Sequence, residues 1–137
     1  MPAWAGDPPD LASPQITQAQ RVEASRFVDE KLALWIGNLG LDEWQISALL
    51  TPRQELKKKT LGGIRWDKKK KTAVIHVMDP ADYDMPYAEM LADLEFTIVH
   101  ELVHLELSSL PRTASSRSHE ERAVNRLAEA LLKLDRE

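Results

Sequence analysis

The first regular pattern of apolar positions begins at Gln15. From there to residue 36, apolar side chains recur at steps of three and four residues, which predicts an amphipathic helix. Gly37 and Gly40 follow this run and are typical of a helix end. The apolar residues that define the pattern are Val22, Phe27, Leu32, Leu34, Trp35 and Ile36.

Three short segments with the composition of strands follow this helix. Residues 44–50 predict one strand, and residues 64–66 and 72–77 predict two more. The charged residues 67–71 between the last two segments are typical of a hairpin tip. Together the segments predict a small, three-stranded and mainly antiparallel sheet.

Two longer helical patterns complete the chain, at about residues 87–107 and 118–134. The segment between them contains Pro111 and several Ser and Thr residues, which favour a break in the helix. Ser118 is a candidate N-cap for the last helix, with Glu121 at the capping-box position three residues later. The order of helix, small sheet, helix and helix predicts an α+β fold.

The helix at residues 87–107 is predicted to be buried, because it is apolar on two sides. A polar stripe formed by Thr97, His100, Glu101 and His104 runs between those sides. Buried polar groups without partners are costly, and one bound metal ion would satisfy this set together. The apolar sides are formed by Leu91, Leu94, Ile98, Leu102 and Leu105, and by Phe96, Val99 and Val103.

The length of 137 residues fits one domain with its own core. Residues 1–14 hold four of the eight prolines, so we expect a disordered or loosely held tail there. The domain proper is expected at residues 15–137. The formal net charge of -4 argues against a nucleic-acid-binding protein, because such proteins offer an excess of Lys and Arg to phosphates.

The chain contains no cysteine, which excludes a disulfide framework, a zinc ribbon and a thiolate nucleophile. Any transition metal must therefore be held by histidine and carboxylate groups. The first ten residues lack the basic start and apolar run of a signal peptide. No stretch approaches the ~18–20 apolar residues that a membrane span requires. We therefore expect a cytoplasmic protein with no membrane partner.

Residues 100–104 read His-Glu-Leu-Val-His, and this motif contains the candidate metal ligands and the candidate catalytic base. Two histidines four residues apart on a helix lie one turn apart, roughly 6 Å along the axis, so both rings can reach one metal ion. Zinc held there lowers the pKa of bound water to about 7 and polarises a peptide carbonyl. Glu101 can then carry a proton from the water to the leaving amine.

A catalytic zinc site needs a third protein ligand and leaves one position open for water. The last helix offers His119, Glu120 and Glu121. Helical periodicity leaves the choice open, because Glu120 lies near the centre of the expected buried face and Glu121 at its flank. An acidic residue near a helix start can also merely complement the helix dipole. The expected buried face consists of Val124, Leu127, Ala128 and Leu131.

The register of the last helix resembles that of the gluzincin metallopeptidases, in which Asn or Asp follows the ligand glutamate by four residues and a small residue follows three later. Glu121, Asn125 and Ala128 match this register. Residues 125–132 also carry an Asn-x-x-Ala-x-x-Leu-Leu sequence similar to that of ImmA/IrrE-type peptidase domains. The resemblance covers about residues 44–134. It implies a minimal gluzincin fold with Glu121 as the third zinc ligand, and an edge strand at Val77 along which substrate lies.

Four further side chains are weaker candidates for a place at the metal site. Asn125 could hydrogen-bond the second nitrogen of a ligand histidine and fix its ring. Tyr83 and Tyr87 precede the motif helix and could stabilise an oxyanion, although such residues more often pack. His76 lies in a strand and is a less favoured ligand than the pentad histidines.

The sequence therefore predicts a zinc-dependent metallopeptidase that acts on a peptide or protein. His100, His104 and Glu121 are its expected zinc ligands, and Glu101 is its expected base and acid. Two alternatives stay open. A zinc-stabilised regulatory or protein-binding module would keep the metal without hydrolysis, and a plain interaction domain would use the lysines of residues 57–59 and 68–71 to contact an acidic partner.

Overall fold

The computed structural model describes residues 16–56, 62–111 and 113–136. These residues form three α-helices, a three-stranded sheet and short 3-10 turns, which confirms the predicted α+β class. The predicted tail at residues 1–14 lies outside the described residues. Within the described ranges, no helix has both the length and the apolar content needed to cross a membrane.

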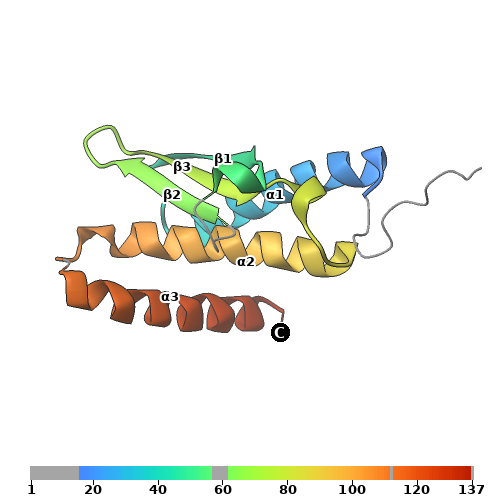
Figure 1. Ribbon diagram of the computed structural model, residues 1–137. Coiled ribbons are helices and arrows are strands. Elements are labelled where there is room, and N and C mark those ends of the chain that lie inside the picture. Colours follow the sequence, from blue (N-terminus) through green and yellow to red (C-terminus); the bar gives the residue numbers. More distant parts are fainter. Residues whose placement is uncertain (1–15, 57–61, 112, 137) are drawn as a thin grey trace, which may run out of the picture.

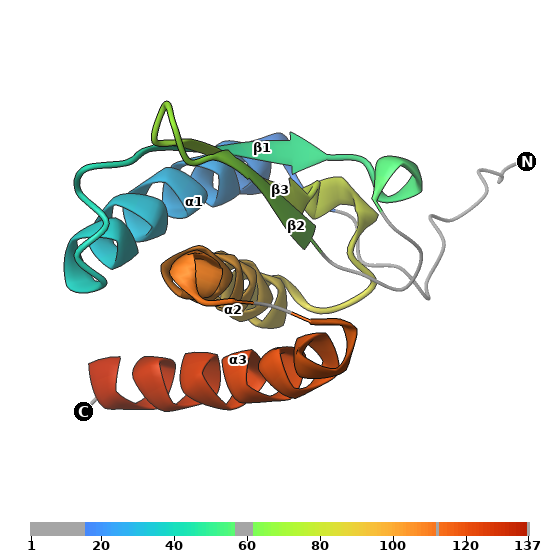
Figure 2. The ribbon, with the colours of Figure 1, turned by 90° about the vertical axis from the view of Figure 1, so that its left-hand side faces the viewer.

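The elements stack in three layers (Figures 1 and 2). The sheet forms one layer, α1 (Gln18–Asn38) and α2 (Tyr87–Glu106) cover one of its faces, and α3 (Ala114–Asp135) packs on the far side of α2. Because α2 is covered on both sides, its two apolar sides are both used, as predicted. Its fully buried residues include Leu94, Ile98, Val99 and Leu102.

α1 begins three residues after the predicted start, because Thr17 caps it at Gln18. The Thr17 hydroxyl accepts a hydrogen bond from the Gln20 backbone N–H, and the Gln20 side chain accepts one from the Thr17 N–H. Val22 and Leu34 of the predicted pattern are 49% and 39% exposed. The buried face instead consists of Ala24, Val28, Leu32 and Trp35.

The sheet has the strand order β1-β3-β2, with β1 (Gln45–Thr51), β2 (Gly62–Asp67) and β3 (Thr72–Met78). β2 and β3 form the predicted antiparallel hairpin, but β1 runs parallel to β3, so the sheet is mixed rather than mainly antiparallel. β3 is the central strand, and the prediction of an edge strand at Val77 is therefore wrong. Val77 is 0% exposed, as expected for a strand paired on both sides. The edge beside α2 is β2.

The register of the hairpin determines which side chains face the helices. Ile64 on β2 stands opposite the fully buried Ile75 on β3, so this pair faces α1 and α2. Side chains alternate along a strand, so the next pair, Gly63 and His76, belongs to the outer face of the sheet, as does Arg65. His76 and Arg65 are therefore on the other side of the sheet from α2.

A buried polar contact joins α1 to α2. Nε1 of Trp35 donates a hydrogen bond to Oε2 of Glu95 at 2.8 Å, and Nζ of Lys31 lies 3.6 Å from the same oxygen. Glu95 is only 6% exposed, and a buried carboxylate is costly without donors. The contact therefore favours one rotation of α2, with Glu95 toward α1 and the His-Glu motif on roughly the opposite side.

α3 begins at Ala114, four residues before the predicted start, because its N-cap is Thr113. The Thr113 hydroxyl accepts a hydrogen bond from the Ser116 N–H, and the Ser116 hydroxyl accepts one from the Thr113 N–H. The predicted capping pair of Ser118 and Glu121 is therefore wrong. The polar start of this helix has the composition of a loop, which is why the sequence pattern located its beginning too late.

Candidate metal centre

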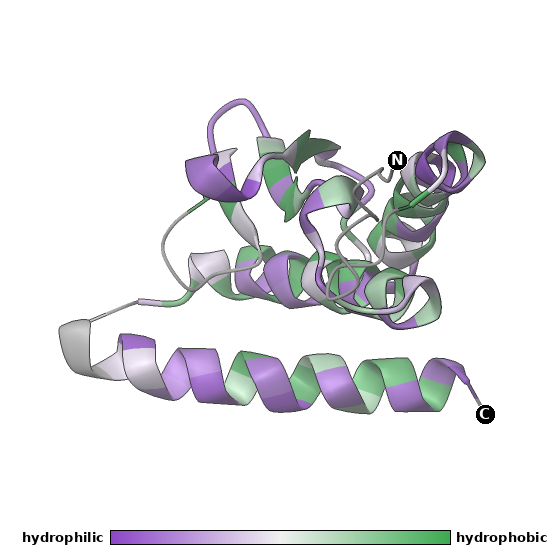
Figure 3. Ribbon diagram, turned by 45° about the vertical axis from the view of Figure 1, so that its right-hand side comes forward, coloured by the Kyte–Doolittle hydropathy of each residue, from purple (hydrophilic) through white to green (hydrophobic). Residues whose placement is uncertain are grey.

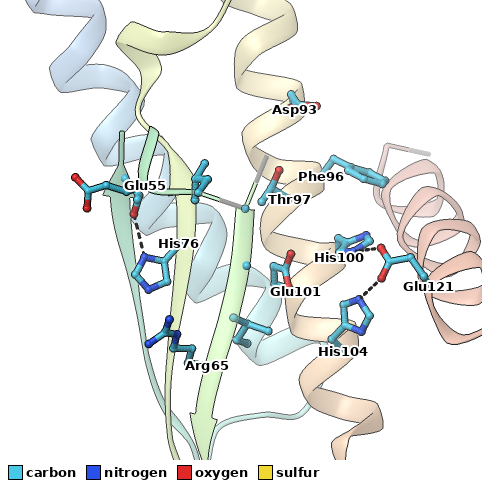
Figure 4. A pocket seen from close by; sticks show the side chains of 15 residues that line it. Glu55, Arg65, His76, Asp93, Phe96, Thr97, His100, Glu101, His104 and Glu121 are labelled. Atoms are coloured by element: carbon cyan, nitrogen blue, oxygen red, sulfur yellow. Dashed lines mark hydrogen bonds and ion pairs between the residues drawn. The ribbon is translucent and has the colours of Figure 1, made fainter. Parts of the chain in front are cut away.

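The polar stripe of α2 opens into a cleft. His100 and His104 project from successive turns toward α3, with ring centroids 4.8 Å apart, whereas Glu101 points toward β2 (Figure 4). The two histidine side chains are 13% and 16% exposed. The ring of Phe96 packs one turn before His100, at a centroid distance of 5.8 Å. Both histidine rings are thus restricted in position, and both point toward α3.

α3 places Glu121 against both histidines. Its Oε1 lies 2.9 Å from Nε2 of His100, and its Oε2 lies 3.1 Å from Nε2 of His104. One carboxylate therefore bridges the two ring nitrogens that the pentad presents on one side (Figure 4). The structure brings together the three residues predicted as ligands, and His119 is exposed and does not join them.

Glu120 contacts the same site from behind His104. Its Oε2 lies 2.7 Å from Nδ1 of His104, which is the ring nitrogen away from Glu121. The Glu120 side chain is only 16% exposed, against 54% for Glu121. Glu120 therefore points further inward than Glu121, as helical periodicity predicts. Its position suits a residue that orients a ligand histidine, and Glu121 has the position of the ligand itself.

The early start of α3 removes the main competing role of Glu121. Counted from Ala114, Glu121 is the eighth residue of the helix. The favourable effect of an acidic residue on the helix dipole falls off within the first turn. Neither N-capping nor the dipole therefore accounts for Glu121, and its described contacts are with His100 and His104.

A bound cation could replace the protons that the two histidines share with Glu121. Carboxylates only accept hydrogen bonds, so His104 needs protons on both ring nitrogens to contact Glu120 and Glu121. His100 donates from Nε2, while its buried Nδ1 has no partner among the described residues. Burial lowers the pKa of His100, and the negative charge of Glu121 opposes that effect. A cation at the two Nε2 positions would replace both shared protons and keep the bond from Nδ1 of His104 to Glu120.

The three donor atoms also fit zinc in their spacing. One ligand atom from each of His100, His104 and Glu121 lies within 4.8 Å of the others. Tetrahedral zinc has bonds of about 2.0–2.1 Å to nitrogen and oxygen, which separates neighbouring ligand atoms by about 3.3 Å. The two glutamate–histidine contacts of 2.9 and 3.1 Å are close to that spacing. Imidazole and carboxylate donors suit zinc and several other divalent metals.

Glu101 has the environment of a proton acceptor that works near neutral pH. It is 8% exposed. Burial raises its pKa to about 7, with His104 opposing the rise and the charge of Glu121 adding to it. A general base or acid works best when its pKa is near the operating pH. Glu101 lies one residue after His100, on the side of the stripe that faces the cleft.

The cleft has a volume of about 940 Å³ and takes its lining from several elements. α2 forms its floor, β2 contributes one wall and Glu121 of α3 lies on the other (Figure 4). Asp93 and Gly62 are among the lining residues that were not singled out from the sequence. Asp93 could have been found, because it precedes His100 by seven residues and so lies two turns away on the same side of α2.

Gly62 allows β2 to lie directly against α2. A Cβ atom at this position would come within 2.5 Å of Cγ2 of Thr97 and 2.6 Å of the backbone oxygen of His76. Thr97 is 5% exposed and precedes Glu101 by one turn. At the adjacent Gly63, an added Cβ would meet nothing within 4 Å. The absent side chain of Gly62 therefore sets the distance between the edge strand and the motif helix.

Three of the weaker candidates lie away from the histidine pair. The Tyr83 hydroxyl donates a hydrogen bond to Asp93, and the Tyr87 hydroxyl donates to Glu23, so both tyrosines are engaged elsewhere. His76 lines the outer part of the cleft, and its Nδ1 lies 3.0 Å from Oγ1 of Thr51. The predicted oxyanion role of the two tyrosines is not supported by these positions.

Asn125 lies beside His100. Its side chain raises the pKa of the imidazole, although burial has the larger and opposite effect. The predicted hydrogen bond to the second ring nitrogen is not formed, because Nδ1 of His100 has no partner among the described residues. Asn125 therefore interacts with His100 through its side chain, but not at Nδ1.

The structure describes only one of the two lysine runs. Residues 57–59 lie outside the described residues. At the hairpin tip, Nζ of Lys68 donates a hydrogen bond to the backbone oxygen of Ser108, and Nζ of Lys71 lies 3.1 Å from Glu43. These two lysines thus make contacts within the domain, which weakens the alternative that the run docks an acidic partner.

Comparison of the chain with models of protein families, with curated proteins and with solved structures finds no match.

Proposed function

We propose that this protein is a zinc-dependent metallopeptidase. The observation that carries the proposal is the Glu121 carboxylate, which contacts Nε2 of both His100 and His104 beside an open cleft. Structural zinc sites are closed by four protein ligands, whereas catalytic sites have three and keep one position open. Three donor residues gather here among the described residues, and Glu121 is 54% exposed.

Each residue at the site has a role in the proposed reaction. His100, His104 and Glu121 would hold the ion, and a zinc ion held there would polarise the peptide carbonyl and acidify water. Glu101 accepts a proton from water at its carboxylate while the water oxygen attacks the carbonyl carbon. It then delivers this proton to the leaving nitrogen as the peptide C–N bond breaks. Glu120 holds His104 in one orientation through Nδ1.

The edge strand β2 supplies a place for the peptide. Its outer edge has no partner strand in the part of the chain that the structure describes, and Gly62, Gly63 and Ile64 line the cleft next to Glu101. An extended peptide can add to such an edge through backbone hydrogen bonds. The substrate we propose is therefore a peptide or an extended segment of a protein. A chain without cysteine suits the reducing cytoplasm, where we propose that it acts.

The experiment that tests the proposal measures zinc content and peptide hydrolysis together. The protein loaded with zinc and dialysed should retain close to one ion per chain and cleave members of a peptide library. Glu101→Gln should keep the ion and lose cleavage, because an amide cannot accept the proton. His100→Ala and His104→Ala should lose both. Zinc retention with no cleavage of any peptide would favour the non-catalytic regulatory module instead.

A further inference from the structure

Asp93 stands at the end of the cleft nearest the start of α2. It lies two turns before His100 on the same side of the helix, so its backbone is about 10.5 Å from that of His100 along the axis. Figure 4 shows Asp93, Phe96 and His100 in succession along one side of α2. Asp93 thus lies beyond the metal centre, in the part of the cleft that residues flanking a cleaved bond would reach.

A buried tyrosine fixes the position of the Asp93 carboxylate. The Tyr83 hydroxyl donates a hydrogen bond to its Oδ2 at 3.0 Å, and Tyr83 is only 3% exposed. Burial raises the pKa of Tyr83, so the phenol stays neutral and remains a donor. A carboxylate fixed by a buried partner has a defined position, which a specificity-determining residue needs.

No counter-ion of Asp93 is found among the described residues. Within the described ranges, Tyr83 is the only side chain that donates to it, and no ion pair involves it. Burial raises the pKa of Asp93, which means that its ionised form is short of solvation. A cation brought by a ligand would supply the missing charge.

The described part of the cleft lining contains few lysine or arginine side chains. The described lining residues include Glu55, Glu101 and Glu121 besides Asp93, and the only lysine or arginine among them is Arg65. Arg65 belongs to the outer face of the sheet, away from α2. Among the described lining residues, no lysine or arginine on the side of α2 therefore competes with a cationic ligand at Asp93.

We propose that Asp93 determines specificity by binding a lysine or arginine side chain of the peptide. The proposal rests on the proposed function, because it takes the peptide to lie in this cleft. An extended peptide advances by about 3.3 Å per residue. A peptide that runs parallel to α2 would cover the distance of about 10.5 Å between Asp93 and His100 with about three residues, so we expect the basic residue about three positions from the cleaved bond.

The test uses binding, so that it does not depend on turnover. Zinc-loaded Glu101→Gln protein is titrated with fluorescent peptides that differ at one position only, which carries lysine, norleucine or glutamate. Lysine and norleucine have stems of similar length and differ in charge. We expect the lysine peptide to bind about tenfold more tightly at one position, and the advantage to shrink as salt is raised. Glutamate should bind most weakly.

Two matched variants assign the effect to Asp93. In Asp93→Asn the side-chain oxygen can still accept the Tyr83 hydrogen bond, so the fold is preserved while the charge is removed. This variant should bind the lysine and norleucine peptides equally, with the norleucine affinity unchanged. Glu89→Gln removes an exposed carboxylate one turn earlier on α2, outside the cleft, and should keep the preference. Thermal unfolding of both variants checks that they are folded.

The outcomes separate this inference from the proposed function. Equal binding of the lysine and norleucine peptides, or a lysine preference that survives Asp93→Asn, overturns the role of Asp93 and leaves the peptidase proposal intact. In that case the carboxylate serves only as the partner of Tyr83. If the protein retains no zinc and binds no peptide of any charge, both proposals fail together.

Discussion

Oε2 of Glu120 lies 2.7 Å from Nδ1 of His104, while Nε2 of the same ring lies 3.1 Å from Glu121. Two consecutive glutamates of α3 therefore contact opposite nitrogens of one imidazole. In metal sites a ligand histidine commonly donates its second N–H to a carboxylate, which fixes the ring and its tautomer. We therefore propose different tasks for the two glutamates, although either could be the ligand on sequence grounds.

The first prediction separates those tasks. Glu121→Ala should weaken zinc binding strongly, because it removes a direct ligand. Glu120→Ala should weaken it by about 10–100-fold, which is typical for loss of a partner that orients a ligand. Chelator competition at fixed pH measures both affinities. A larger loss for Glu120→Ala than for Glu121→Ala would mean that the ligand and the orienting residue are the reverse of what we propose.

The arrangement of the His-Glu motif could be predicted from the sequence because it is local. The one-turn spacing of His100 and His104 follows from helix geometry, and Glu101 between them follows with it. The α+β order and the β2–β3 hairpin were also predicted correctly. The division of roles between Glu120 and Glu121 could not be derived from periodicity, because it depends on where α3 meets α2.

The errors of prediction have physical causes of two kinds. The parallel pairing of β1 with β3 joins segments far apart in the sequence, and no local pattern specifies it. The start of α3 was misplaced because Ser and Thr occur both in loops and at helix caps. Leu127 was expected to be buried and is 46% exposed, since the buried face of α3 runs through Val124, Ala128 and Leu132.

The second prediction tests the start of α3. Thr113→Ala should lower the free energy of unfolding by about 1 kcal/mol, because it removes the acceptor for the Ser116 N–H. Ser118→Ala should have a smaller effect, since Ser118 lies inside the helix. Urea denaturation of both variants gives the comparison. A larger loss from Ser118→Ala would support the later start that the sequence pattern indicated.

The third prediction concerns the packing of β2 on α2. Gly62→Ala should destabilise the protein by about 1–3 kcal/mol, because its Cβ would overlap both Thr97 and the backbone of His76. Gly63→Ala is the matched control, since an added methyl group there meets nothing within 4 Å. It should be neutral or slightly stabilising. Equal effects of the two variants on thermal unfolding would contradict the close contact at Gly62.

The fourth prediction concerns the link between α1 and α2. Trp35→Phe removes the donor to Oε2 of Glu95 and leaves a buried carboxylate with Lys31 at 3.6 Å. We expect a loss of at least about 1–3 kcal/mol, the usual cost of an unsatisfied buried acceptor. Glu95→Gln keeps an oxygen that can accept from Trp35 and should cost less. The double variant would then show non-additivity in denaturant titrations, and strict additivity would argue against the contact.

The last prediction uses the raised pKa of Glu101 in protein stripped of metal by a chelator. Burial raises this pKa from its ordinary value of 4.5 to about 7. Between those values the folded protein binds more protons at this site than the unfolded chain does. The contribution of Glu101 to stability therefore falls as pH rises through that window. Above about pH 7 the cost of the buried charge is fully present, and below about pH 4.5 it is absent.

Glu101→Gln removes the charge, so this variant should be more stable than the parent at pH 8, by about 1–3 kcal/mol. The gain should shrink on acidification and vanish near pH 4.5. Glu106→Gln, an exposed change on the same helix, is the control and should show no such dependence. Urea denaturation across this pH range measures the difference. A gain that stays constant with pH would show that packing, and not ionisation, distinguishes the two proteins. Zinc should reduce the gain at pH 8, because a nearby cation favours the ionised carboxylate.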